Sequence, residues 1–193
     1  TERPNIPDLD PAFYGFTDAD QETVFDTSNT FFGKNNMSLR ELLNALRETY
    51  CGTLGAEYMY TTDQAEKRWW QQKLESIRSK PNFTADKKKQ ILDRLTAAEG
   101  LERYLHTKYV GQKRFSLEGG ESFIAAMDEL IQQAGAKGVQ EVVIGMAHRG
   151  RLNVLVNTMG KLPADLFAEF DHTAPEDLPA GDVKYHQGFS SDV

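Results

Sequence analysis

The spacing of apolar residues changes along the chain, and each change predicts a different kind of structure. Residues 1–36 have no regular apolar period, because prolines come early and aromatic residues are scattered among Asp, Thr and Asn. Prolines and turn-forming residues oppose regular structure, and aromatic rings need a surface on which to pack. We therefore predict that residues 1–36 form an extended arm that lies on another part of the protein.

Residues 37–110 instead follow a helical period, with apolar side chains recurring on one face. Ser38 and Glu41 have the spacing of a capping box, in which the two side chains bond free N–H groups of the first turn. Thr96 and Glu99 repeat that spacing, so we expect a separate helix to begin there. The expected helices begin at Ser38, near Thr62 or Asp63, at Thr84 and at Thr96, and Pro81 ends the second.

Residues 111–193 alternate helical and strand-like patterns. Helical periods cover residues 121–134 and 151–159, whereas residues 141–147 form a nearly continuous apolar run with glycine inside and before it. A short β-branched run is typical of a strand buried on both faces, and residues 182–186 are a second candidate strand. Helices that alternate with buried strands predict the α/β fold class, here a helical lead-in followed by the start of a layered domain.

Composition excludes several classes of protein. The 193 residues include 22 Lys and Arg against 29 Asp and Glu, and this net charge of −7 argues against a general nucleic-acid binder. Cys51 is the sole cysteine, which rules out an internal disulfide and a cysteine-based zinc site. We find no apolar run that could cross a membrane and no signal peptide. We expect the chain to be a segment of a longer protein.

The strongest candidate for chemistry lies where the expected strand 141–147 meets the next helix. His148, Arg149 and Arg151 follow one another there. Ligands of open α/β sheets bind at such strand ends, and two arginines at a helix start are favourable when an anion neutralises them. His148 could bond such a ligand or move a proton near neutral pH. The alternative is that the arginines pair with acids elsewhere and His148 is structural.

A second polar cluster spans residues 184–191, where His186 and hydroxyl groups surround Gly188. The cluster could form another wall of the same site, or a loop that uses Gly and Ser only for its turn geometry. His106 and His172 are weaker candidates. Because no two histidines have the i, i+4 spacing of a helical metal site, we expect no metal site within this sequence.

Several strings of residues occur in an order that is typical of one enzyme family. They lie at residues 57–59, 66–69, 95–102, 113–120, 145–154 and 181–186. Together they closely resemble the thiamine-diphosphate-dependent decarboxylating component of the 2-oxoglutarate dehydrogenase complex. The resemblance covers nearly the whole chain, and residues 190–192 resemble the bacterial branch of the family.

The resemblance implies a homodimeric oxidoreductase of the tricarboxylic acid cycle that binds thiamine diphosphate and Mg²⁺. Such an enzyme decarboxylates 2-oxoglutarate and passes the succinyl group to a lipoyl arm of the dihydrolipoyl succinyltransferase component. It also implies that residues 111–193 begin a parallel-sheet thiamine-diphosphate-binding domain. The implied location is the bacterial cytoplasm, with the mitochondrial matrix as the alternative.

The matching motifs imply roles for individual residues. His148 and His186 match histidines that contact the substrate and the intermediate, and they are the expected catalytic residues. Ser190 matches a position in the substrate pocket, and Arg149 matches an arginine that contacts the cofactor. The family's magnesium motif and the glutamate that activates the cofactor are not in this sequence. We therefore expect the metal ligands to lie outside this segment, and the segment alone to be inactive.

Two other functions stay open on the sequence. One is a relative that prefers 2-oxoadipate or that joins carbon skeletons. The other is a partner-docking module, in which the arm and the helical region bind another protein and the α/β part is a scaffold. An interaction module should tolerate substitution of His148 and His186, whereas an enzyme should lose turnover and keep its fold.

Overall fold

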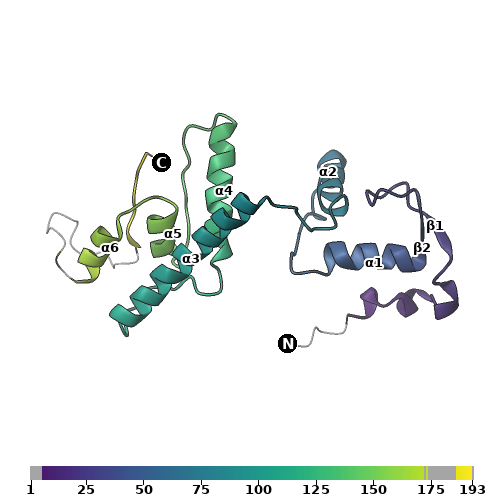
Figure 1. Ribbon diagram of the computed structural model, residues 1–193, viewed down its shortest axis with the longest axis horizontal. Coiled ribbons are helices and arrows are strands. Elements are labelled where there is room, and N and C mark those ends of the chain that lie inside the picture. Colours follow the sequence, from purple (N-terminus) through teal and green to yellow (C-terminus); the bar gives the residue numbers. More distant parts are fainter. Residues whose placement is uncertain (1–5, 172, 174–185, 193) are drawn as a thin grey trace. The chain divides into compact units, whose positions relative to one another are not determined.

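The computed structural model describes residues 6–171, 173 and 186–192. The chain divides into two compact units, Thr1–Asn82 and Phe83–Val193, and each is considered by itself. Figure 1 shows that helices dominate both units. In the described ranges the sheet structure is one pair of antiparallel strands, and no helix is long and apolar enough to cross a bilayer.

The region that the sequence predicts as an extended arm contains short regular elements. They are η1 (Pro7–Leu9), η2 (Pro11–Tyr14), η3 (Asp18–Asp20), β1 (Val24–Asp26) and β2 (Asn36–Ser38). The two strands pair antiparallel, with Phe25 opposite the buried Met37. The N–H of Arg40 donates to the carbonyl of Gln21 at 3.1 Å, so this part of the chain lies against the start of the next helix.

Two helices complete the first unit, α1 (Leu39–Tyr50) and α2 (Gln64–Glu75). The capping box predicted at the start of α1 is confirmed. Ser38 Oγ accepts the N–H of Glu41 at 3.3 Å, and the Glu41 carboxylate accepts the N–H of Ser38 at 3.1 Å. Asp63 caps α2 through its carboxylate, which confirms the predicted start of that helix.

Two helix boundaries differ from those that the sequence predicts. The second helix, α2, ends at Glu75 and does not continue to Pro81. A proline limits how far a helix can continue, but it does not fix where the helix ends. The separate helix expected from Thr96 is wrong, since α3 (Ala85–Lys108) runs through it without a break. The Thr96 hydroxyl donates to the Leu92 carbonyl at 2.8 Å, a bond that threonine forms in helix interiors.

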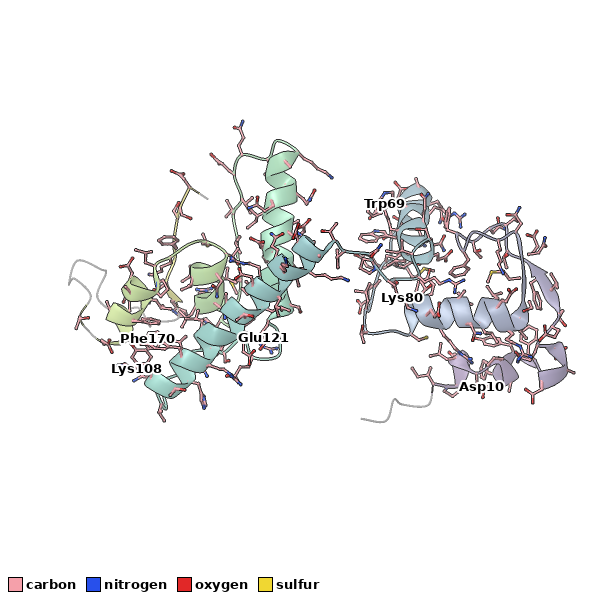
Figure 2. All side chains as sticks on the ribbon, in the orientation of Figure 1. Asp10, Trp69, Lys80, Lys108, Glu121 and Phe170 are labelled. Atoms are coloured by element: carbon pink, nitrogen blue, oxygen red, sulfur yellow. The ribbon has the colours of Figure 1, made fainter. Side chains whose placement is uncertain are left out.

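In the second unit three helices pack around α3. They are α4 (Ser122–Ala136), α5 (Arg151–Asn157) and α6 (Pro163–Phe170). One buried cluster joins α3 to α5 and α6, and a second joins α3, α4 and α5. Figure 2 shows Phe170 near the end of α3, where its ring centroid lies 4.8 Å from that of Tyr109. The buried residues are Leu101, Leu105, Tyr109, Leu152, Leu155, Leu166 and Phe170 in the first cluster and Ala98, Leu117, Ile124 and Val154 in the second.

The buried strand expected at residues 141–147 is not present in this structure. These residues have no regular secondary structure, and the side chain of Val143 is 95% exposed. A strand needs a neighbour that satisfies its N–H and C=O groups, and the described residues of this unit form no other strand to supply one. The second candidate strand, 182–186, lies outside the described residues except for His186. The described fold is therefore mostly helical and contains no parallel sheet.

Candidate functional site

The two histidines that the sequence predicts as catalytic lie in contact. His148 Nε2 and His186 Nε2 are 2.6 Å apart, within hydrogen-bonding distance. Their rings stack with centroids 4.7 Å apart and planes inclined by 26°. One nitrogen must donate and the other accept, so at least one of the two imidazoles has no proton at its Nε2 atom.

A tight turn before α5 places His148 in this contact. Gly150 adopts a φ of 77°, and its N–H donates to the Phe115 carbonyl at 2.8 Å. A Cβ atom at Gly150 would come within 2.5 Å of Leu117 Cδ1, closer than side chains normally approach. Glycine is thus required here for both its backbone conformation and its lack of a side chain.

The loop at residues 113–118 covers one face of His148. The Phe115 ring stacks on the imidazole with centroids 4.7 Å apart, and Lys113 Nζ lies 4.8 Å from the centre of the Phe115 ring. Desolvation lowers the pKa of His148, and the positive charges of His186, Arg151 and Lys113 lower it further. The neutral form of His148 is therefore favoured near neutral pH.

The two arginines beside His148 hold their guanidinium groups through backbone oxygens. Arg149 Nη2 donates to the Glu118 carbonyl at 2.9 Å, and Arg151 Nη2 donates to the Met146 carbonyl at 2.5 Å. Among the residues that the structure describes, neither arginine forms an ion pair with a carboxylate. The alternative in which acids neutralise these arginines thus finds no support there. The site carries a positive charge that attracts anions.

Ser190 lines a different part of the protein surface from the one where the two histidines meet. It lines a cavity of about 1050 Å³ together with residues 139–144 and Met159, and neither histidine is among the described residues that line this cavity. The neighbouring Ser191 donates from Oγ to the Met159 carbonyl at 2.6 Å. The assignment of Ser190 to the substrate pocket stays a prediction.

The sequence does not predict the buried ion pair between Glu102 and Arg114. Glu102 on α3 is 2% exposed. Its Oε2 accepts from Arg114 Nη1 at 2.5 Å, and its Oε1 accepts from the Leu117 N–H at 3.0 Å and from Asn153 Nδ2 at 3.1 Å. One signal could have indicated it: Asn153 and Asn157 stand one turn apart in the otherwise apolar stretch of α5, and buried amides need partners.

Of the other two histidines, the structure describes only His106. His106 Nδ1 lies 3.3 Å from Arg114 Nη2, which gives it a structural neighbour in the ion-pair network. His172 lies outside the described residues. Within the described part of the chain, no group of three or more His, Cys, Asp or Glu side chains could hold a metal ion.

Comparison with known proteins finds relatives that match nearly the whole of this chain. No family model matches the chain. It is 79% identical over 192 residues to the 2-oxoglutarate dehydrogenase E1 component of Cupriavidus necator, which covers 100% of this chain and 20% of that protein. The E1 component of Azotobacter vinelandii is 55% identical over 186 residues, covering 96% of this chain and 20% of that protein.

A third relative supports the same conclusion. The 2-oxoglutarate dehydrogenase E1 component of Haemophilus influenzae is 49% identical over 189 residues, covering 97% of this chain and 20% of that protein. This chain spans about a fifth of the length of the curated relatives that it matches. Because the identity extends through the whole of this sequence, the chain belongs, as one segment, to the family of the 2-oxoglutarate dehydrogenase E1 components.

Proposed function

We propose that this chain is part of an enzyme that oxidatively decarboxylates 2-oxoglutarate and passes the succinyl group to a lipoyl-carrying succinyltransferase. The observation that carries the proposal is the contact of His148 with His186 beside two arginines that pair with no described carboxylate. A positively charged site with a group that can move a proton suits a substrate with two carboxylates. The relatives are 2-oxoglutarate dehydrogenase E1 components, which agrees with this chemistry.

We assign proton transfer to the histidine pair. The neutral form of His148 is favoured by its lowered pKa, and a neutral imidazole can accept a proton at Nε2. The 2.6 Å separation lets the two Nε2 atoms share one proton. Held close to a bound 2-oxo acid, the pair can give that proton to the 2-oxo oxygen and take it back, while Arg151 attracts a carboxylate of the substrate.

Thiamine diphosphate, when bound, would supply a nucleophilic carbon and an acceptor for the electron pair of decarboxylation. Among the described residues we assign Arg149 to the diphosphate. One of its N–H donors is used on the Glu118 carbonyl, and a guanidinium has five such donors in a geometry that suits phosphate oxygens. The described residues do not fit Mg²⁺, so its ligands would come from the rest of the enzyme. We propose that this enzyme is a homodimer of the bacterial cytoplasm.

We also propose that residues 141–147 become a strand of a parallel sheet in the intact enzyme. Val142 and Val143 are 48% and 95% exposed, although strand-like runs of this kind are normally covered on both faces. Strands from the rest of the polypeptide would satisfy the backbone groups of this run and bury its side chains. This completes the α/β domain that the sequence predicts.

Substrate preference of the intact protein tests the proposed function. Purified full-length protein is supplied with thiamine diphosphate, Mg²⁺ and an artificial electron acceptor, and reduction of the acceptor is followed with 2-oxoglutarate, 2-oxoadipate or pyruvate. Turnover that strongly favours 2-oxoglutarate is the expected result. A preference for 2-oxoadipate would keep the chemistry and change the substrate, and no turnover with any of the three would overturn the proposal.

A further inference from the structure

We propose that Glu102 is a positioning residue for His148, which its buried carboxylate holds in place through the loop at residues 113–118. Glu102 touches neither His148 nor His186 in the contacts described above. The inference rests on the proposed catalytic function of His148, and it adds a residue that acts on that histidine from the helix beneath the site.

The carboxylate of Glu102 contacts three segments of the second unit. Glu102 projects from α3, Arg114 and Leu117 belong to the loop, and Asn153 lies on α5. The ion pair is shielded from water, because the side chains of Glu102 and Arg114 are 3% and 10% exposed. Ion pairs in such surroundings are screened little, so each partner depends strongly on the other.

The loop at residues 113–118 contacts residues 148–150, which we call the histidine turn. Each residue of the turn bonds to or stacks on the loop that Glu102 holds: the Phe115 ring stacks on His148, the Glu118 carbonyl accepts from Arg149, and the Phe115 carbonyl accepts from the Gly150 N–H. Movement of the loop would therefore displace all three residues of the turn together.

The same carboxylate also holds α5, the helix on the other side of the histidine turn. Asn153 Nδ2 donates to Glu102 and to the Ala98 carbonyl at 2.9 Å, and Asn153 is fully buried. One residue further on, the Val154 N–H donates to the Gly150 carbonyl at 3.0 Å, which closes the first turn of α5. The histidine turn is thus fixed at both ends by groups that bond Glu102.

The arrangement of bonds suggests a variant that removes only one of them. The two neutral donors, the Leu117 N–H and Asn153 Nδ2, both bond Oε1, whereas Arg114 bonds Oε2. In Glu102→Gln the amide oxygen can replace Oε1 and the amide NH₂ group then faces the guanidinium. The two neutral bonds are kept and the ion pair is lost, with little change in volume.

Glu99 provides a matched control on the same helix. It lies one turn before Glu102 and pairs with Arg103 at 3.1 Å, but the Glu99 and Arg103 side chains are 55% and 79% exposed. Glu99→Gln makes the same chemical change at a solvent-exposed ion pair, which contributes little to structure. Its kinetics should match those of the unchanged protein.

The experiment measures kcat and KM for 2-oxoglutarate, together with the rate at which diethyl pyrocarbonate modifies His148, in the full-length enzyme. In Glu102→Gln we expect kcat to fall about 10- to 100-fold, because small misplacements of a reacting group have effects of this size, with a smaller change in KM. We also expect His148 to be modified faster, because Phe115 no longer covers it. A merely structural role would lower the melting temperature without moving either quantity.

The two readouts separate this inference from the proposed function. Values of kcat and His148 modification equal to those of Glu99→Gln would overturn the inference. If the unchanged enzyme has no activity on 2-oxoglutarate, the proposed function fails and the modification rates alone decide the role of Glu102. If Glu102→Gln does not fold, Arg114→Lys, which keeps the charge and loses the planar guanidinium, replaces it with the same expectations.

Discussion

His148 Nε2 lies 2.6 Å from His186 Nε2, although the two residues are 38 positions apart in the sequence. At this distance the two Nε2 atoms can hold one hydrogen between them, so the two imidazoles form a single proton-carrying group. Desolvation lowers the pKa of His148, and the charges of His186, Arg151 and Lys113 lower it further.

Substitution of His186 should separate proton transfer from substrate binding. If His186 moves a proton, His186→Ala should lower kcat by about 10²- to 10⁴-fold. If it only binds the distal carboxylate, KM should rise instead. Steady-state kinetics on the full-length protein distinguish the two. Unchanged kcat and KM would remove His186 from the site.

Desolvation, His186 and Arg151 lower the pKa of His148 most, and the charge of Lys113 should lower it further. Among the described residues, the charges of His186, Arg151 and Lys113 act on this imidazole, and the ring of Phe115 stacks on it. Removing one positive neighbour makes the protonated form less unfavourable, so Lys113→Met should raise the pKa of His148. Diethyl pyrocarbonate modifies only the neutral ring of His148. The midpoint of the modification rate plotted against pH should therefore move to higher pH.

The control for that titration is Lys108→Met, which removes the same charge from the last turn of α3. Lys108 is not among the groups whose charge lowers the pKa of His148. An equal shift of the midpoint in both variants would show that net charge, and not the place of Lys113, controls the titration. A downward shift in Lys113→Met would contradict the assigned electrostatics outright.

Two glycines allow a test of why the histidine turn needs glycine. Gly150 and Gly160 both have a φ of 77°, but a Cβ would meet Leu117 at Gly150 and nothing within 4 Å at Gly160. Gly160→Ala should lose about 1–2 kcal/mol through backbone strain alone. Gly150→Ala should lose about 1–3 kcal/mol more through overpacking. Thermal or denaturant unfolding of the full-length protein measures both, and equal losses would show that the close approach is not important.

Two threonines of α3 test the corrected helix boundary. Thr84 Oγ1 accepts the N–H of Lys87 at the helix start, whereas Thr96 donates to a carbonyl within the helix. Thr84→Ala should therefore lower the free energy of unfolding by about 1 kcal/mol. Thr96→Ala should have no effect or a small stabilising one, because alanine has the higher helix propensity. A loss in Thr96→Ala as large as that in Thr84→Ala would support a helix start there.

These differences show what the sequence can predict about this fold. The helix starts at Ser38, Asp63 and Thr84 depend on contacts within a few residues, so the local pattern was enough. Thr96 shows the same local pattern, but helix-forming residues continue on both sides of it, and only the whole segment decides between a cap and a helix interior. The strand expected at residues 141–147 is not present, because a strand needs a pairing partner, which no local pattern can supply.

The candidate site was predictable to a similar degree. The resemblance indicated His148 and His186, and the structure brings them together. Arg149 could be proposed from its place beside them, while the cavity that Ser190 lines contains neither histidine. Glu102 was missed because its partners lie 12 to 51 residues away, and the pattern of a helix does not reveal which of its charged residues is buried.

A double-substitution cycle on the full-length protein tests the central claim most directly. The quantity measured is kcat for 2-oxoglutarate in His148→Ala, His186→Ala and the variant that carries both changes. If the pair acts as one group, the double variant should be no slower than the slower single variant. Losses that multiply in the double variant would show that the two histidines act independently and would contradict this account.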